Sequence, residues 1–351
     1  MQSYPIQYNP FIFPQTCEQN IYLNLTSQNY QIIQNIETNC NPSILQKSIE
    51  NTSLNTIIEK ADPQKIYKTY PNRIDKQLFK IYSADILSNF FKKSTSKLPC
   101  VDFLQDHKIS SHYRGKMVDW MVEIFYKFHS NEETFFAAVN IMDRFISEYN
   151  KIIGDEYLYI IGLTSIYIAS KVFDSSHLCM YNIIHDLGKD GVSVSKICYF
   201  EQKILKTISF EIFGDDAFDT IEIIIIDMVF NNKKKFENEE SIKCVYILEN
   251  TVKFVLKVIK HYDIFSPVKS AYLAFGSFLV GYDLVKENSK KCKDIIDIFQ
   301  KYLNLVIDKI FMTKEGKNKL FQIYQYIREG MKKYSESDYK NLTKFHELFF
   351  E

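Results

Sequence analysis

The distribution of proline constrains this fold more than any other feature of the sequence. Seven of the eight prolines precede residue 100, and none occurs between Pro99 and Pro267. The first glycine is Gly115, and the chain has only 10 glycines in 351 residues. Because the tight turns of a many-stranded sheet depend on Pro and Gly, the sequence favours long helices joined by polar connections.

Charge and composition exclude several classes of partner. The 43 basic and 43 acidic side chains give a formal net charge of zero, whereas a protein that binds nucleic acid through its overall field needs a charge of one sign. The longest apolar run, 223–226 with its flanks, is too short to span a membrane. The cysteines and histidines lack zinc-binding spacing. We therefore expect an intracellular protein with no metal, no cofactor, and no direct nucleic-acid or membrane contact.

Helical periodicity divides the chain into three parts. Residues 1–74 form a low-complexity extension rich in Asn and Gln, which we expect to be largely disordered. Apolar residues recur at helical spacing from 75 to 213 and again from 214 to 351. The expected helices are 76–91, 111–127, 135–146, 155–172, 182–187 and about 193–208 in the first set, and 216–230, 241–262, 267–285, 292–310 and 317–333 in the second. The sequence thus predicts an all-α fold of two successive five-helix bundles, preceded by the extension and an N-terminal helix.

Local signals suggest where some of these helices start. Residues 130–133 have the pattern of a capping box, and Asp155 can cap the helix that follows it. Ser193 or Ser195 can open the last helix of the first set. Pro267 suits the first turn of a helix, where its missing N–H is not needed.

Two charged residues interrupt apolar helix faces. Glu201 lies four residues after Ile197 and three before Ile204, on the apolar stripe of its own helix. Lys171 lies near the end of its helix, four residues after Tyr167. A plain interpretation makes Lys171 a snorkelling side chain near a helix C-terminus and Glu201 an edge residue with its carboxylate in water. Spacing alone leaves this interpretation and a functional one open.

Arginine is scarce, with four residues against 39 lysines. A sequence that uses Lys nearly everywhere can retain Arg where a planar group with five donors is needed. Arg114 lies near the start of one predicted helix and Asp143 lies within the next. An ion pair between them would tie the two helices together, and the alternative is two unrelated surface charges.

Four ordered segments carry a pattern known from one protein family. Residues 113–123 read YRGKMVDWMVE, and residues 140–147 read NIMDRFIS. They are similar to M-R-A-I-L-V-D-W-L-V-E and N-x-x-D-R-F-L-S of the cyclin box of mitotic, A/B-type cyclins. Residues 162–171 and 200–212 resemble the third and fifth helices of that box. The resemblance implies that 75–213 is a cyclin box with its preceding helix, and that the second set of helices is a C-terminal cyclin-like domain.

The resemblance implies a regulatory subunit rather than an enzyme. Cyclins bind a cyclin-dependent protein kinase as a heterodimer and hold its movable helix in the active position, which controls cell-cycle progression in the nucleus and cytoplasm. In the family, the positions of Lys171 and Glu201 form the polar centre of the kinase interface. The matching apolar contacts would come from Phe210, Ile212 and Val172. Alternatives are a helical scaffold, or a cyclin-fold transcription factor without kinase activation.

The resemblance also implies a substrate-docking patch and a structural ion pair. Arg114 and Asp143 match the family's buried ion pair, in which the loss of one partner would strand a charge. Lys116 stands where the family has an aliphatic residue. It therefore adds a positive charge to the docking groove, which should bind the positively charged residue of a peptide. This patch, which would bind substrate or inhibitor peptides with R-x-L-type motifs, would be formed by Tyr113, Met117, Trp120, Glu123 and Tyr159.

Overall fold

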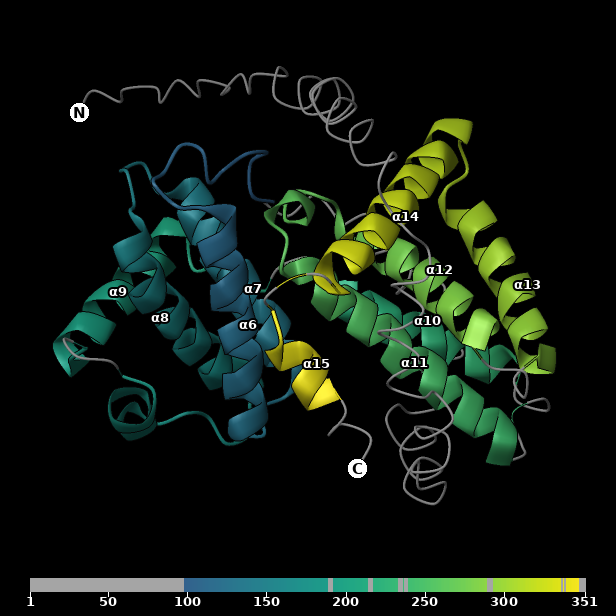
Figure 1. The fold of residues 1–351 in the computed structure, drawn as a ribbon, viewed down its shortest axis with the longest axis horizontal. Coiled ribbons are helices and arrows are strands. Elements are labelled where there is room, and N and C mark those ends of the chain that lie inside the picture. Colours follow the sequence, from purple (N-terminus) through teal and green to yellow (C-terminus); the bar gives the residue numbers. More distant parts are fainter. Residues whose placement is uncertain are drawn as a thin grey trace, which may run out of the picture. The chain divides into compact units, whose positions relative to one another are not determined.

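The computed structural model describes residues 98–188, 192–213, 217–232, 236, 239–288, 293–335, 337 and 339–346. Within these ranges every regular element is a helix, apart from an isolated bridge between Lys108 and Gly154 (Figure 1). The predicted all-α class is therefore confirmed. The extension 1–74 and the helix expected at 76–91 lie outside the described residues, and the predicted domain boundaries stay predictions.

The first set of helices is built around α7. The set consists of α6 (Ser111–Lys127), α7 (Glu132–Glu148), α8 (Asp155–Phe173), the π-helical turn η1 (Asn182–Asp186) and α9 (Val194–Thr207). Helix α7 contacts α6, α8 and α9, and its residues Ala138, Val139 and Met142 are fully buried. Apolar side chains on several sides of α7 explain this central position, because an all-round apolar helix must be covered on every side.

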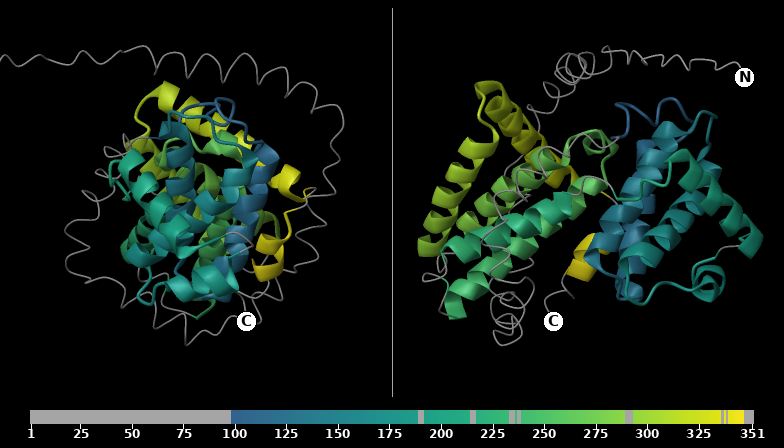
Figure 2. Two further views of the ribbon diagram at one scale, coloured as in Figure 1. Left: turned by 90° about the vertical axis from the view of Figure 1, so that its left-hand side faces the viewer. Right: turned by 180° about the vertical axis from the view of Figure 1, so that it is seen from behind.

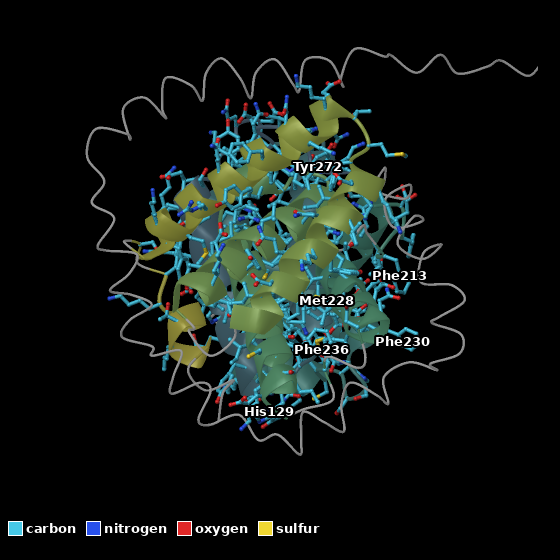
Figure 3. The ribbon with its side chains drawn as sticks, turned by 90° about the vertical axis from the view of Figure 1, so that its right-hand side faces the viewer. His129, Phe213, Met228, Phe230, Phe236 and Tyr272 are labelled. Atoms are coloured by element: carbon cyan, nitrogen blue, oxygen red, sulfur yellow. The ribbon has the colours of Figure 1, made fainter. Side chains whose placement is uncertain are left out.

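The second set is built around α12. It consists of α10 (Ala217–Asn231), α11 (Glu239–Lys260), the 3-10 turn η3 (Asp263–Phe265), α12 (Ser270–Asn288), α13 (Lys293–Ile310) and α14 (Lys314–Ser335). Helix α12 contacts α10, α11, α13 and α14. The core of this set includes Met228 and Phe236, which are labelled in Figure 3, and the fully buried Phe275 and Phe278.

A short helix beyond the second set was not expected from the sequence. Helix α15 (Asn341–His346) packs against α6, so the end of the described chain returns to the first set of helices (Figure 2). Leu342 of α15 is fully buried. Six residues are too few to show a helical periodicity, and this helix depends on a contact with a distant part of the chain.

Serine caps open α6 and α9. The hydroxyl of Ser110 accepts a hydrogen bond from the N–H of Tyr113 at 3.1 Å. The hydroxyl of Ser193 accepts one from the N–H of Lys196 at 3.3 Å, so Ser193 is the residue that opens α9. Each bond satisfies one of the N–H groups that the first turn of a helix leaves unpaired.

Tertiary contacts displace two of the other predicted caps. The predicted capping box at 130–133 is wrong, because Asn131 is the N-cap of α7 and its side chain makes no cap bond. That side chain instead donates to the carbonyl of Phe173 at 2.7 Å. Asp155 is the first residue of α8 rather than its cap, which is Gly154. The Asp155 carboxylate accepts from the backbone N–H at the start of α6, at 3.1 Å.

The predicted place of Pro267 is also wrong. Helix α12 begins only at Ser270, and Pro267 lies in the turn that precedes it. The neighbouring Ser266 donates its hydroxyl proton to the carboxylate of Asp143 at 2.7 Å. This bond to another helix holds the segment outside α12, which the local signal of a proline could not reveal.

Candidate functional site

The two charged residues that interrupt apolar faces meet on the surface between α8 and α9. Lys171, near the end of α8, forms an ion pair with Glu201 in the middle of α9. The Lys171 ammonium also lies 4.2 Å from the centroid of the Tyr167 ring, where the ring's electrons attract a cation. The two side chains remain 32% and 19% exposed. A pair of this exposure adds little to stability, and its charged groups remain accessible to a partner.

Exposed apolar side chains lie at the ends of the same two helices. Phe210 is 64% exposed and Val172 is 38% exposed, whereas Ile212 is partly buried against the core. Phe213, which the sequence analysis did not single out, is 76% exposed and lies at the margin of the view in Figure 3. Its ring meets the Phe173 ring edge to face, with the centroids 5.5 Å apart. The sequence feature that could have identified Phe213 is its position after α9, where an aromatic residue belongs to no apolar helix face.

These residues form one candidate site. Large apolar groups that surround a small number of polar groups are typical of the centre of a protein interface. We name it the α8–α9 surface, and it comprises Lys171, Val172, Glu201, Phe210, Ile212 and Phe213.

Arg114 and Asp143 pair in the interior. The Nε and Nη2 atoms of Arg114 donate to the two carboxylate oxygens of Asp143 at 2.9 and 2.6 Å. Arg114 also donates to the carbonyl of Lys260 at 2.9 Å, so the pair joins α6, α7 and the end of α11. Burial alone would lower the pKa of the Arg114 guanidinium, but the charge and hydrogen bonds of Asp143 raise it. The guanidinium therefore stays charged inside the protein.

The residues of the expected docking patch separate into an exposed and a buried group. The rings of Trp120 and Tyr159 contact each other in a tilted arrangement with centroids 5.1 Å apart, and Tyr113 on α6 is 53% exposed. Met117 is only 6% exposed, and its side chain fills the space that a Cβ at Gly162 would need. Met117 therefore contributes to the core rather than to an open surface.

Glu123 links the docking patch to the C-terminal segment. Its carboxylate is exposed and accepts a hydrogen bond from the side-chain amide of Asn341, the first residue of α15, at 3.4 Å. The exposed Lys116 lies about two turns closer to the start of α6 than Glu123. The patch therefore carries one cation and one anion, and the anion is shared with α15.

Metal sites and membrane-spanning helices are both absent from the described residues. The described part of the chain contains no group of three or more His, Cys, Asp or Glu side chains placed to hold a metal ion. Among the same residues, no helix has the length and apolar character needed to cross a membrane.

Comparison with known proteins finds a family whose model matches the first set of helices. Residues 85–213 match the family model described as the cyclin N-terminal domain. The S-phase entry cyclin-6 of Saccharomyces cerevisiae is 26% identical over 215 residues, which cover 60% of this chain and 52% of that protein. The G2/mitotic-specific cyclin-B of Emericella nidulans is 30% identical over 133 residues, which cover 37% and 27%. The chain thus spans about half or less of the length of these curated relatives.

A solved structure has the same arrangement of helices. A viral cyclin from herpesvirus saimiri superposes with a TM-score of 0.51 at 15% identity, over 70% of this chain and 97% of the viral chain. This likeness concerns the fold alone, whereas the match to the family model includes all four segments that resemble the cyclin box. Together these findings show that residues 85–213 match the cyclin N-terminal domain and that the fold is similar to that of a cyclin.

Proposed function

We propose that this protein is a non-catalytic regulatory subunit that binds and activates a cyclin-dependent protein kinase, and so controls cell-cycle progression in the nucleus and cytoplasm. The observation that carries the proposal is the accessible Lys171–Glu201 ion pair among the exposed apolar groups of the α8–α9 surface. Similarity to S-phase and mitotic cyclins supports the choice of partner.

The proposed mechanism is a shift of the kinase's conformational equilibrium. A protein kinase is active when a lysine on one of its strands pairs with a glutamate on its movable helix. A partner that binds the kinase more tightly when this helix is in the position that allows the pairing increases the population of the active state. The apolar side of α9 is anchored by Ile197 and Ile204, and the end of the helix by its C-cap Ile208; all three are fully buried. Because this support exists before binding, little ordering free energy is lost when the complex forms.

Within the complex the two charged residues would have complementary roles. Lys171 supplies hydrogen-bond donors and Glu201 supplies acceptors for polar groups around the movable helix. The apolar surface around the kinase's movable helix would be contacted by Phe210, Ile212 and Val172. The intramolecular ion pair then serves to hold both charges in place while the partner is absent.

Charge exchange tests this mechanism. We expect Lys171→Glu and Glu201→Lys each to weaken kinase binding by at least about 100-fold, because each places a like charge against the kinase. The double variant, with both exchanges, restores the intramolecular ion pair but presents the opposite charges to the kinase. We therefore expect it to recover the stability of the folded protein but not its affinity for the kinase. Binding is measured by calorimetry and folding by circular dichroism. Lys317→Glu, which breaks an exposed pair with Asp308, is the control.

Other outcomes would identify other functions. Kinase binding that survives the double exchange contradicts the proposed site. Recovery of no kinase by the folded wild-type chain favours a helical scaffold. Salt-sensitive binding to DNA at physiological ionic strength favours a transcription factor.

We further propose that Tyr113, Trp120, Tyr159 and Glu123 bind peptides with R-x-L-type motifs. Glu123 would pair with the cation of the motif, and the aromatic rings would receive its apolar side chain. Lys116 opposes the same cation. Replacement of Lys116 by Ile should therefore raise the affinity for an R-x-L peptide about 3- to 10-fold, measured by fluorescence anisotropy, whereas a decrease would place the peptide elsewhere.

A further inference from the structure

We propose that Arg144, which is buried in α7, is a positioning residue that holds the turn at 209–213 in the shape that presents Phe210 and Phe213 to the kinase. The proposal rests on the proposed function, and it adds Phe213 to the residues that contact the partner. Three observations carry it: the backbone of the turn, the contacts of Arg144, and the exposure of the two rings.

The backbone of the turn adopts an unfavourable conformation. Ser209 and Phe210 have φ values of 55° and 59°, which place two successive residues with side chains in the left-handed region. Such residues are costly and persist only when their surroundings impose them. Local hydrogen bonds provide part of this constraint, since the N–H of Phe210 donates to Leu205 at 2.8 Å and the N–H of Glu211 donates to Ile208 at 3.0 Å.

Arg144 supplies a constraint from outside the turn. Its side chain is only 3% exposed, and Nη1 donates to the backbone carbonyl of Glu211. Its Nη2 lies 3.5 Å from the Glu211 carboxylate and 3.4 Å from Glu148 on α7. Arg144 is therefore a buried cation whose partners lie largely in the turn. A contact of this kind fixes the path of the backbone at Glu211, one residue after the second left-handed position.

The same path determines where the two aromatic rings lie. Phe210 precedes Glu211, and Phe213 follows it by two residues. Both rings are more than half exposed, and Phe213 also meets Phe173 at the end of α8. An unfavourable backbone that exposes two phenylalanines is costly to the isolated protein. Burial of the rings in a partner would offset this unfavourable free energy, as it does for the aromatic anchors of interfaces.

Hydrogen exchange tests the positioning role without any partner. We expect Arg144→Met to accelerate exchange of the amides of Phe210 and Glu211 about 10- to 100-fold, the loss expected when a charged hydrogen bond is removed. Exchange in the buried part of α7 should change far less. Glu148→Gln is the matched control, because it removes a partner of Arg144 that does not belong to the turn. Unchanged exchange in the turn would overturn the positioning role whether or not a kinase binds.

Binding to the kinase recovered with the wild-type chain tests the consequence. Arg144→Met should weaken binding about 10- to 100-fold, and Ser209→Gly in the same chain should restore most of it, because glycine adopts the left-handed conformation without cost. A merely structural role of Arg144 predicts no such rescue. Phe213→Ala should weaken binding by at least about tenfold, and wild-type affinity in this variant would remove Phe213 from the interface.

The variants also separate this inference from the proposed function. If Arg144→Met does not fold, Arg144→Lys retains the charge and one donor group, and it should give intermediate exchange and binding. Accelerated exchange together with the absence of any kinase partner would contradict the proposed function while leaving Arg144 as the residue that shapes the turn. Failure of both the exchange and the rescue would overturn the inference alone.

Discussion

Arg114 and Arg144 show how this chain uses its few arginines. Both are buried, and each guanidinium joins elements that are far apart in the sequence. A lysine at either place would offer one ammonium without the planar fork that reaches several acceptors at once. Arg328, on the exposed side of α14, donates to the hydroxyl of Tyr324 at 3.2 Å and so joins neighbouring turns of one helix.

The Arg114–Asp143 pair leads to a prediction about stability. Replacement of Asp143 by Asn should lower the free energy of unfolding by about 3–5 kcal/mol, because it leaves a buried guanidinium without a counter-charge. Urea denaturation followed by circular dichroism measures the loss. Asp308→Asn removes an exposed partner of Lys317 and should cost less than about 1 kcal/mol. Equal losses in the two variants would show that the buried charge is stabilised by other groups.

At the scale of elements, the C-terminal segment joins the two sets of helices. The ring of Tyr339 lies against Gly115 of α6. It is also near the rings of His261, which directly follows α11, and Tyr334 of α14. The N–H of Asn341 donates to the carboxylate of Asp119 on α6 at 3.1 Å. The absence of a side chain at Gly115 makes this close approach possible. A glycine inside α6 would otherwise weaken the helix.

Gly115 therefore provides a test of how α15 docks. In the wild-type chain, Gly115→Ala should destabilise the protein by about 1–3 kcal/mol, because the new methyl group collides with the Tyr339 ring. In a Tyr339→Ala chain the same substitution should stabilise it by up to about 1 kcal/mol, because alanine is the better helix former. Thermal unfolding of the four proteins measures both effects. A change of the same sign in both backgrounds would contradict the docking of Tyr339 on α6.

At the scale of the whole molecule, a charge network joins α7 to α11. Lys253 on α11 lies 3.2 Å from Glu132 on α7, 3.0 Å from Glu222 on α10 and 2.7 Å from Glu249 on its own helix. Lys257 also pairs with Glu132. Burial alone would raise the pKa of Glu132, but Lys257 and Lys253 lower it from 4.5 to about 2. The network therefore makes the contact between the two sets of helices dependent on pH.

The sign of this dependence follows from the lowered pKa of Glu132. The carboxylate stabilises the folded protein above pH 4.5, and this contribution is lost as the pH falls toward 2. We expect Glu132→Gln to lower the free energy of unfolding by about 1–2 kcal/mol at pH 7, a value reduced for its partial exposure. The difference from wild type should shrink between pH 4.5 and 2 in urea titrations. Glu329→Gln, in an exposed pair with Lys332, should show no such trend.

Sequence reasoning predicted those parts of the protein that depend on neighbouring residues. Helical spacing predicted the main helices of both sets because each buries one face against the core, and that requirement is repeated along the chain. It also singled out Lys171 and Glu201, because a charge on an apolar stripe is a local anomaly. Local signals failed at Asp155 and Pro267, where a contact with a distant helix decides where the helix starts.

The amino-acid sequence by itself thus determined the all-helical class, the family resemblance and the two charges of the candidate interface. Only the tertiary structure decided that Arg144 reaches the turn after α9, that Phe213 is exposed beside Phe173, and that α15 returns to α6. The physical reason is the range of the interactions. Periodicity and capping act over a few residues, whereas a guanidinium, an aromatic ring or a buried leucine finds its partner wherever the folded backbone brings one within reach.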